Sequence, residues 1–437
     1  MNCLLPLNSL LRTLALVSLT LPMASSLQGG AFTLTEQNAS GIGTAFSASA
    51  EAKDASTIFY NPAGLTRLDR QELVGAVNVI VLSGGYVDEG STTAGFIPIS
   101  GGNGGNPGGA TPIPTLYYAL PISDSLVAGF GMHVPFGLST SYDEGWVGRY
   151  HGLNTELATI NLNPSIGLKL TESLSIGFGF SYQYVEATFT NAIDFGLAGW
   201  AMEIPGFAPG SADGAVAVEG SNWGTGYNFG ILWEPMAGAR FGLAYRSQIG
   251  NTVTGDATFA DVPAPFQPIF YDQGFTAALD LPASISGNFF YQVDSHWSVM
   301  ADITWTNWDV LQEIVINFED PLTPTATLPQ HWNNSFIYSG GVHYSAGNLT
   351  YKLGLAFDET PIPSPEYRSP RIPDSDRTWV SFGMTFRTSE TLSFDVGYAH
   401  LFMAEGPTNF TDDQTHNLKG TFNLRADVFS GQVTWKF

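Results

Sequence analysis

Apolar and polar residues alternate along most of the chain after Arg70. Between Ser173 and Val185, apolar side chains occupy every second position, and Ser, Gly and Gln stand between them. The same period of two recurs in 297–306, 378–386 and 392–399. Successive side chains of a strand point to opposite faces, so these segments are predicted to be β-strands with one apolar face.

About 14 segments between residue 71 and the C-terminus fit this template. They are 71–82, 112–121, 124–138, 156–170, 173–190, 223–235, 239–254, 273–293, 295–318, 332–346, 348–358, 376–387, 391–405 and 420–437. Their connections alternate between tight turns, such as Asp294-Ser295, and long loops, such as 83–111 and 191–222. Short turns at one end and long loops at the other are typical of outer-membrane β-barrels, with the turns in the periplasm.

The last segment ends in an aromatic residue, Phe437, as the assembly signal of bacterial outer-membrane barrels does. Its alternation changes phase near Val428, which a β-bulge or a different register would explain. A sheet in lipid has to close, because an open edge would leave backbone groups unpaired. The predicted fold is therefore all-β, a 14-stranded antiparallel transmembrane β-barrel.

Composition supports this prediction and narrows the function. Charged residues make up 13% and aromatic residues 13%, and no apolar run of about 20 residues follows the N-terminus. The formal net charge of −23 argues against nucleic acid as a partner. Residues 1–28 are expected to be a secretory signal, with Arg12, a short apolar core and small residues near a cleavage site. Cys3 would leave with it, and no cofactor or metal site is predicted.

Residues 29–70 lack any sustained period and are rich in small residues, so they are predicted to be a plug, or hatch, inside the barrel of residues 71–437. The chain here resembles the FadL family, outer-membrane transporters of long-chain fatty acids and other hydrophobic compounds. The resemblance rests on AFTLTEQNASGIGTAFSASAEAKDAST and NPAGL in the hatch, GMHVPFGLSTSYDEGWVGRY and TINLNPSIGLKL in the third and fourth segments, and AFDETPIPSPEYRSPRIPDSDR near the C-terminus.

The resemblance implies a route for a hydrophobic ligand. It would land in an apolar groove between the third and fourth long loops, move to a lumen pocket at the hatch, and leave sideways through an inward kink of the third strand. The residues for these roles are Trp200, Met202, Ile204, Phe207, Phe266, Ile269 and Phe270 for the groove, Phe32, Leu34, Asn61, Pro62 and Ala63 for the hatch, and Pro135, Phe136 and Gly137 for the kink.

Each assignment has a simpler structural alternative. The apolar loops could pack on each other and cap the barrel, Pro135 and Gly137 could form an ordinary bulge, and Asn61-Pro62-Ala63 could be a turn that fixes the plug to the wall. Phe32 and Leu34 could belong to the packing of the plug.

One departure from the family concerns charge. In its fatty-acid member, basic residues on the third and fifth long loops meet the carboxylate, but 191–222 and 319–332 contain no Lys or Arg here. Either the ligand is neutral, such as an alkane, an aromatic compound or an esterified lipid, or another cation serves, with Lys352 and Arg377 as the first candidates and Arg368 and Arg371 as others. Lys352 and Arg377 could equally form lumen ion pairs with acidic residues.

The sequence therefore predicts a passive importer of hydrophobic compounds in the bacterial outer membrane, with long-chain fatty acids as the favoured ligand. It is expected to be a monomer among outer-membrane lipids. Import of neutral hydrocarbons or aromatics is the alternative. A general porin would lack the hatch and carry more charge. An enzyme would need a nucleophile and base together, and the seven His are scattered without a catalytic motif. A purely structural or adhesin barrel would bind no hydrophobe.

Overall fold

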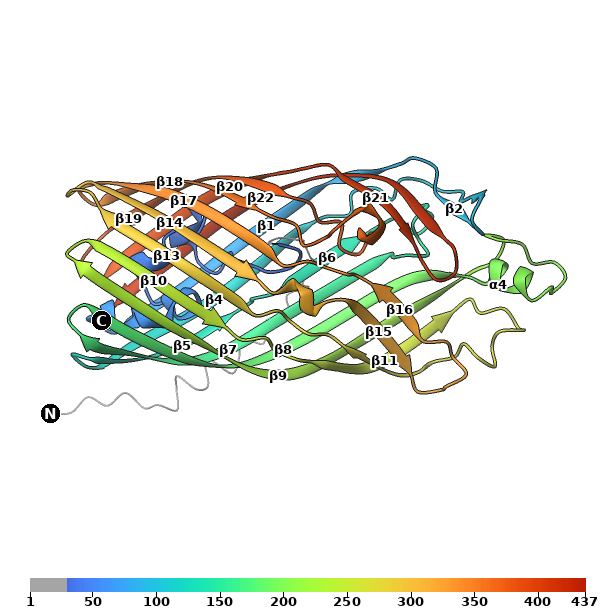
Figure 1. The fold of residues 1–437 in the computed structure, drawn as a ribbon, viewed down its shortest axis with the longest axis horizontal. Helices are drawn as coiled ribbons and strands as arrows, with labels where there is room; N and C mark the ends of the chain where they lie inside the picture. Colours follow the sequence, from blue (N-terminus) through green and yellow to red (C-terminus); the bar gives the residue numbers. More distant parts are fainter. Residues whose placement is uncertain (1–29) are drawn as a thin grey trace.

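The computed structural model describes residues 30–437, which form a closed antiparallel β-barrel of 14 spans around a small helical hatch (Figure 1). The first wall strand, β1 (Glu72–Asp88), pairs with the last, β22 (Asn417–Lys436), and so closes the barrel. The predicted fold class is confirmed. The predicted signal, residues 1–28, lies outside the described residues.

Eight spans are single strands and six are interrupted. The single strands are β1, β22, β4 (Ala110–Ser123), β7 (Asn154–Thr171), β8 (Leu174–Asp194), β9 (Asp213–Met236), β18 (Leu349–Asp358) and β19 (Arg377–Arg387). The interrupted ones are β5 (Leu126–His133) with β6 (Gly137–Ser141), β10 (Ala239–Arg246) with β11 (Thr252–Ala260), β12 (Gln273–Ala278) with β13 (Ser284–Gln292), β14 (Trp297–Thr306) with β15 (Glu313–Phe318), β16 (Ala326–Pro329) with β17 (Ser335–Ala346), and β20 (Leu392–Met403) with β21 (Gly406–Thr411).

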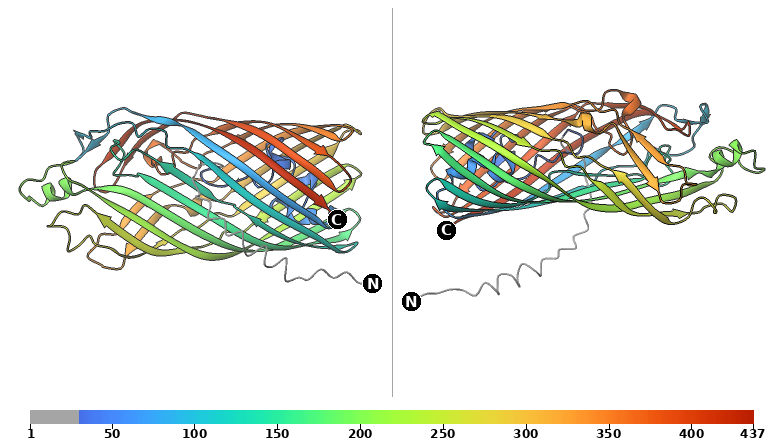
Figure 2. Two further views of the ribbon diagram at one scale, coloured as in Figure 1. Left: turned by 180° about the vertical axis from the view of Figure 1, so that it is seen from behind. Right: turned by 60° about the horizontal axis from the view of Figure 1, so that its bottom comes forward.

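The hatch fills the lumen near the end of the barrel where the C-terminus lies (Figures 1 and 2). Its helices are one or two turns long, and Gly and Ser, which are weaker helix formers than Ala, recur along the segment. They are α2 (Ala39–Ile42), η1 (Ser49–Glu51), α3 (Thr57–Tyr60) and η2 (Pro62–Arg67). Among residues 30–437, no helix is both long enough and apolar enough to cross a membrane. Outside the hatch lie α4 (Phe195–Ala201), η3 (Trp308–Val310), η4 (Pro365–Tyr367) and the short strands β2 (Thr92–Thr93) and β3 (Ile97–Pro98).

The character of the lumen changes along the barrel axis. In β8 the buried face carries Ser175, Ser181 and Gln183 beside the hatch, and then Val185 and Ala187 further out. In β22 the same buried face carries Gln432 at the hatch and Val428 above it. The lumen is therefore polar where it holds the hatch and apolar beyond it.

This change accounts for the apparent phase slip near Val428. The β1–β22 register runs without a shift from Glu72↔Lys436 to Asp88↔Gly420, so neither a bulge nor a new register is present. Below Val428 the outward residues, such as Val433, face lipid. Above it the outward residues, such as Arg425, are polar and the inward ones line the apolar lumen. The environment of the two faces of β22 therefore changes at Val428, while the register of the strand continues unchanged.

The third long loop is shorter than predicted. β8 and β9 stay paired out to Asp194↔Asp213, so the loop spans 195–212 rather than 191–222. The Asp194 carboxylate accepts the Leu197 N–H at 2.7 Å and caps α4. This helix stands at the opposite end of the barrel from the C-terminus (Figure 1).

Candidate functional site

The third span of the wall is broken between His133 and Gly137. β5 ends with His133 opposite Asn161 of β7, and β6 begins with Gly137 opposite Ala158. Four residue steps on this span, from 133 to 137, therefore match three on β7, from 161 to 158, which is the count of a β-bulge. Pro135 lies inside the bulge and has no N–H to donate.

The bulge coincides with an unpaired stretch on the other side of the span. β4 pairs with β5 only from Ser123 to Leu116, and its residues 110–115 pair with β1 alone. Within residues 30–437, the register of β6 runs to β7 and not to β4. The Ser141 N–H, which donates to the Pro107 carbonyl at 3.0 Å, bounds this stretch on its outer side. The predicted kink residues thus lie where the wall lacks a hydrogen-bonded ladder.

The start of the hatch takes the place of the missing strand. The Leu34 N–H donates to the Pro135 carbonyl at 2.9 Å, and the Gly137 N–H donates to the Phe32 carbonyl at 3.0 Å. A side chain at Gly137 would meet Leu34, since an added Cβ would lie 2.8 Å from its Cδ1. The predicted hatch residues Phe32 and Leu34 therefore lie directly against the predicted kink, and they seal it from inside.

Two polar side chains complete the backbone hydrogen bonding of the bulge. The Gln37 amide donates to the Val134 carbonyl at 2.6 Å and accepts the Val134 N–H at 3.1 Å. The Thr159 hydroxyl accepts the Phe136 N–H at 3.0 Å and donates to the Phe136 carbonyl at 2.7 Å. Sequence reasoning missed both, because a Gln in a plug and a Thr in a strand carry no signal of their own.

The Phe32 ring lies in an aromatic cluster. Its centroid is 4.6 Å from Trp308, 5.9 Å from Trp332 and 6.1 Å from Phe136, and all four side chains are buried. Neither tryptophan was predicted to belong to the site. Both lie at breaks of the alternating pattern, beyond the end of β14 and before β17, and a Trp at such a break was the available signal.

A cavity enclosing about 960 Å³, part of it open to solvent, lies between the hatch and the kink. Leu34, Phe46, Phe59, Pro135, Phe136 and Arg246 contribute to its lining. The Arg246 guanidinium donates to the Phe59 carbonyl at 2.9 Å and stacks over the Phe59 ring at 4.6 Å. Among the ion pairs of the described residues it has no acidic partner. We call this space the hatch cavity.

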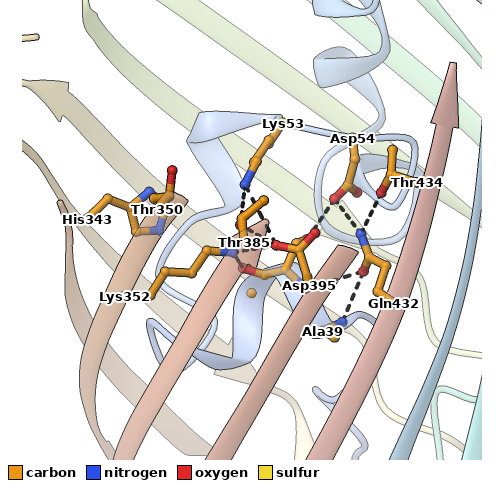
Figure 3. Close-up of polar contacts among 12 residues, drawn as sticks. Ala39, Lys53, Asp54, His343, Thr350, Lys352, Thr385, Asp395, Gln432 and Thr434 are labelled. Carbon is orange, nitrogen blue, oxygen red and sulfur yellow. Dashed lines mark hydrogen bonds and ion pairs between the residues drawn. The ribbon is translucent and has the colours of Figure 1, made fainter. Parts of the chain in front are cut away.

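The other side of the hatch is fixed by charged and polar side chains (Figure 3). Lys352 Nζ lies 2.9 Å from the Asp395 carboxylate and donates to the Ser40 carbonyl at 2.6 Å. Gln432 accepts the Ala39 N–H at 3.0 Å and donates to Asp54 at 2.9 Å. Lys352, predicted as a possible carboxylate partner of the ligand, is thus already paired within the protein.

Arg377, the other predicted carboxylate partner, is also paired. Its guanidinium contacts Asp358 at 3.3 Å and Asp374, and Asp374 in turn accepts the Ala31 N–H at 3.1 Å. Neither Arg377 nor Lys352 lines the hatch cavity. Both side chains hold the hatch and its start in place.

The Asn61-Pro62-Ala63 turn contacts the wall at a third point. The Asn61 side chain accepts the Ala63 N–H at 3.1 Å and donates to the Ile231 carbonyl at 3.0 Å. A Cβ added at Gly177 or Gly230 would lie 2.2 Å from Ala63 or 2.1 Å from Asn61, so only glycine lets the wall approach this turn.

The predicted groove residues divide into two groups. Phe266 is buried and contacts the rings of Phe195 and Phe207, at 4.9 and 5.7 Å, so the third and fourth loops pack on each other. Trp200 and Met202 remain exposed at the tip, with 52% and 64% of their surface accessible. The Ile204 N–H donates to the Gly199 carbonyl at 2.8 Å and closes a turn of the third loop, and the Ile269 N–H donates to the Phe266 carbonyl at 3.0 Å.

A second cavity, the outer cavity, encloses about 1170 Å³ between the long loops, again partly open to solvent. Phe270 is the one predicted groove residue in its lining, together with Phe189, Val218, Ile316 and Leu328. Among residues 30–437, no cluster of His, Cys, Asp and Glu could hold a metal ion. The barrel thus offers two spaces: one at the loops with several apolar wall residues, and one at the hatch and the kink with a mixed polar and apolar wall.

Comparison with known proteins agrees with this architecture. The family model of the outer membrane protein transport protein (OMPP1/FadL/TodX) matches residues 20–437. The long-chain fatty acid transport protein of Escherichia coli K12 is 30% identical over 428 residues, which cover 89% of this chain and 93% of that protein.

Two crystal structures share the fold. A FadL homologue of Pseudomonas aeruginosa superposes with a TM-score of 0.84 at 24% identity, covering 94% of this chain and 100% of that one. The toluene transporter TodX of P. putida superposes with a TM-score of 0.69 at 15% identity, covering 88% and 94%. The chain therefore belongs to the OMPP1/FadL/TodX family of outer-membrane transport proteins, as a multi-pass β-barrel that carries hydrophobic compounds.

Proposed function

We propose that this barrel is a passive importer of long-chain fatty acids and similar amphiphiles, and that it releases them sideways into the outer membrane at the β5–β6 break. The observation that carries the proposal is the bulge at His133–Gly137, which adjoins the hatch cavity and is covered on its inner side by residues 32–37 of the hatch. Movement would be downhill, because an apolar chain is more stable in the bilayer than in water.

The route begins at the exposed Trp200 and Met202, continues through the outer cavity and reaches the hatch cavity. An exposed apolar surface on a loop is the kind of feature that marks a binding surface. Arg246 supports an acidic ligand, because its half-buried guanidinium has no carboxylate partner and an anion would add charge-assisted hydrogen bonds. The relative named as a long-chain fatty acid transport protein favours the same class.

A neutral hydrocarbon is the second candidate ligand. It is favoured by the absence of Lys and Arg from the third loop, residues 195–212, and by the fold shared with a toluene transporter. Retention of oleate and of toluene by the purified barrel in a neutral detergent separates the two. Binding of toluene alone would replace the fatty acid in the proposal and leave the route unchanged.

Deletion of Pro135 tests the exit. It removes the extra residue, so that 133–137 can pair with 161–158 without a bulge, and oleate uptake by cells should fall to background while the barrel still folds. Folding is checked by the heat-dependent shift in gel mobility. Pro164→Thr removes a proline from the neighbouring strand, where the register is continuous, and should leave uptake unchanged. Normal uptake by the deletion variant would exclude exit at this break.

A further inference from the structure

Arg371 is a buried cation at the wall of the outer cavity. It lies in the loop between β18 and β19, only 5% of its surface is accessible, and its side chain lines the cavity. It takes part in none of the Lys or Arg ion pairs formed within residues 30–437. A buried charge without a counter-charge is unfavourable, so its place here calls for a reason.

Neutral groups hold the guanidinium in one orientation. Nη2 donates to the Asn191 side chain at 2.8 Å, and Nη1 donates to the Thr155 hydroxyl at 3.3 Å. The group stacks over the Phe189 ring, with 5.3 Å between the guanidinium carbon and the ring centroid. These contacts fix the planar fork but leave Nε without a partner. One donor of a positioned cation is therefore free.

His151 supplies a second polar group at the same place, with the Asp412 carboxylate 3.8 Å from Nδ1, beyond hydrogen-bond distance. Its side chain also lines the cavity, 4% of its surface is accessible, and neither ring nitrogen forms a hydrogen bond. Arg371 packs against the adjacent Gly152, where an added Cβ would lie 3.2 Å from Arg371 Cγ. Burial lowers the pKa of His151 to about 4, so the ring is neutral at pH 7 and retains one N–H to donate.

The acidic residues nearby do not neutralise Arg371. Asp412 lines the cavity, but its carboxylate accepts the N–H groups of Gln414 and His416 and lies 2.9 Å from His416 Nδ1. Asp413 is exposed. Burial lowers the pKa of Arg371 to about 10, which still leaves the guanidinium charged at pH 7.

The rest of the wall suits an alkyl chain. Phe189, Val216, Val218, Phe259, Ile316 and Leu328 supply the apolar lining. Ligand sites are typically about 300–1,000 Å³ and mainly apolar, with a few placed polar groups. We propose that the outer cavity is a separate carboxylate subsite: Arg371, with His151, binds the headgroup of an anionic amphiphile, and the chain lies along the apolar wall. This inference rests on the proposed function and names the residues that distinguish an acid from a neutral ligand.

The proposed subsite also bears on the absence of Lys and Arg from the third long loop. The third loop lacks Lys and Arg, yet Arg371, from a loop some 180 residues later in the chain, binds Asn191 at the base of that loop. A cation is therefore present beside the third loop, supplied by another part of the sequence.

The test compares oleate with methyl oleate, which has the same chain but no charge. Both are titrated calorimetrically into the mature barrel in maltoside at pH 8. Wild type should bind oleate more tightly, and Arg371→Met should weaken oleate binding about tenfold or more without changing methyl oleate binding, since charged hydrogen bonds of about 1.5–3 kcal/mol are lost. Arg425→Met, which removes an exposed cation from the outward face of β22, is the matched control and should change neither.

Each other outcome is decisive. Equal binding of oleate and methyl oleate by wild type, or discrimination between them that survives Arg371→Met, overturns the subsite. If Arg246→Met abolishes discrimination and Arg371→Met does not, the carboxylate is bound in the hatch cavity and the inference is wrong while the proposed function stands. Binding of neither oleate, methyl oleate nor toluene would overturn the proposed function itself. If Arg371→Met does not fold, Arg371→Lys takes its place, because it keeps the charge but loses the planar fork. Arg371→Lys should bind oleate more weakly than wild type and still more tightly than methyl oleate.

Discussion

The hatch is held in two different ways on its two sides. Toward β18–β22 it is fixed by a buried ion pair, Lys352–Asp395, and by the Gln432 amide. Toward the β5–β6 break it is held by two backbone hydrogen bonds, the Gln37 amide and the ring of Phe32. The first attachment depends on charges that cannot be separated in a dry site without a large penalty, whereas the second consists of neutral contacts that can open singly. The side that faces the proposed exit is thus the side that can release.

The largest effect is expected from breaking the charged attachment. Asp395→Leu leaves the Lys352 ammonium buried without its nearest carboxylate, which should lower the free energy of unfolding by about 3–5 kcal/mol. Denaturant unfolding, followed by tryptophan fluorescence, measures the loss. The double variant Lys352→Met/Asp395→Leu removes both charges of the buried pair and leaves only the partly exposed Lys53, 3.7 Å from Asp395 in the wild type, so it should recover most of the stability. Equal losses in the single and double variants would show that the pair does not hold the hatch.

Breaking the neutral attachment should act locally. Phe32→Ala empties the space between Trp308, Trp332 and Phe136, at a cost of about 3–5 kcal/mol for a buried aromatic side chain. Because the wall does not depend on this ring, the amides of Leu34 and Gly137 should lose protection from hydrogen exchange while those of β8 and β9 keep theirs. Phe422→Ala makes a similar void in the outer part of the barrel, where this buried ring packs against Tyr86 at 4.9 Å, and should leave Leu34 and Gly137 protected. Loss of protection throughout the barrel would contradict a local latch.

The outer loops contain a charged clasp that pH can switch. His416 lies 3.4 Å from Asp194 and 2.9 Å from Asp412, with Tyr150 stacked on it at 4.3 Å and His151 beside it. The two carboxylates raise its pKa from 6.5 to about 9 despite the burial that opposes this. The stabilisation, about 3 kcal/mol, is fully present below pH 6.5 and is lost as pH rises through 9.

The distance between spin labels at positions 201 and 413 measures this clasp, since they lie on the third and the last long loops. It should lengthen between pH 7 and 10 in wild type and stay constant in His416→Gln. The neutral attachment at the kink should not respond over the same range. A distance independent of pH in wild type would exclude the clasp.

Features that depend on neighbouring residues in the sequence could be predicted, whereas contacts between residues far apart in the sequence could not. The alternation around Phe178 or Phe394 predicts a strand because the environment repeats every second residue, and all 14 spans follow from it. The same reasoning failed at Val428, where the lumen becomes apolar and the outward face becomes polar. The alternation of apolar and polar residues does not show which side of the strand faces the lumen, so the exchange looked like a shift in register. Lys352 and Arg371 illustrate the limit at the site. Both are basic residues in the same part of the chain, but whether an Asp lies beside each is decided by residues far away in sequence.

The smallest expected effect isolates the Gln37 amide. Gln37→Leu keeps the size of the side chain but leaves the Val134 N–H and carbonyl without partners, at a cost of about 1–3 kcal/mol. Amide exchange should quicken at Val134, and oleate should leave the hatch cavity sooner, as measured by the release of a fluorescent fatty acid into added vesicles. Gln183→Leu is the matched control, because Gln183 is equally buried in the lumen yet its amide nitrogen has no partner.

The two substitutions together tell a latch from simple packing. If the Gln37 amide latches the bulge, only Gln37→Leu changes the release rate, although both variants replace a buried amide in the lumen by an alkyl group. If both variants change the rate alike, polarity of the lumen governs release and the bulge is passive. If neither variant changes the release rate, the backbone hydrogen bonds of Phe32 and Leu34 are enough to close the wall. The contacts that must open for release are then those of these two residues alone.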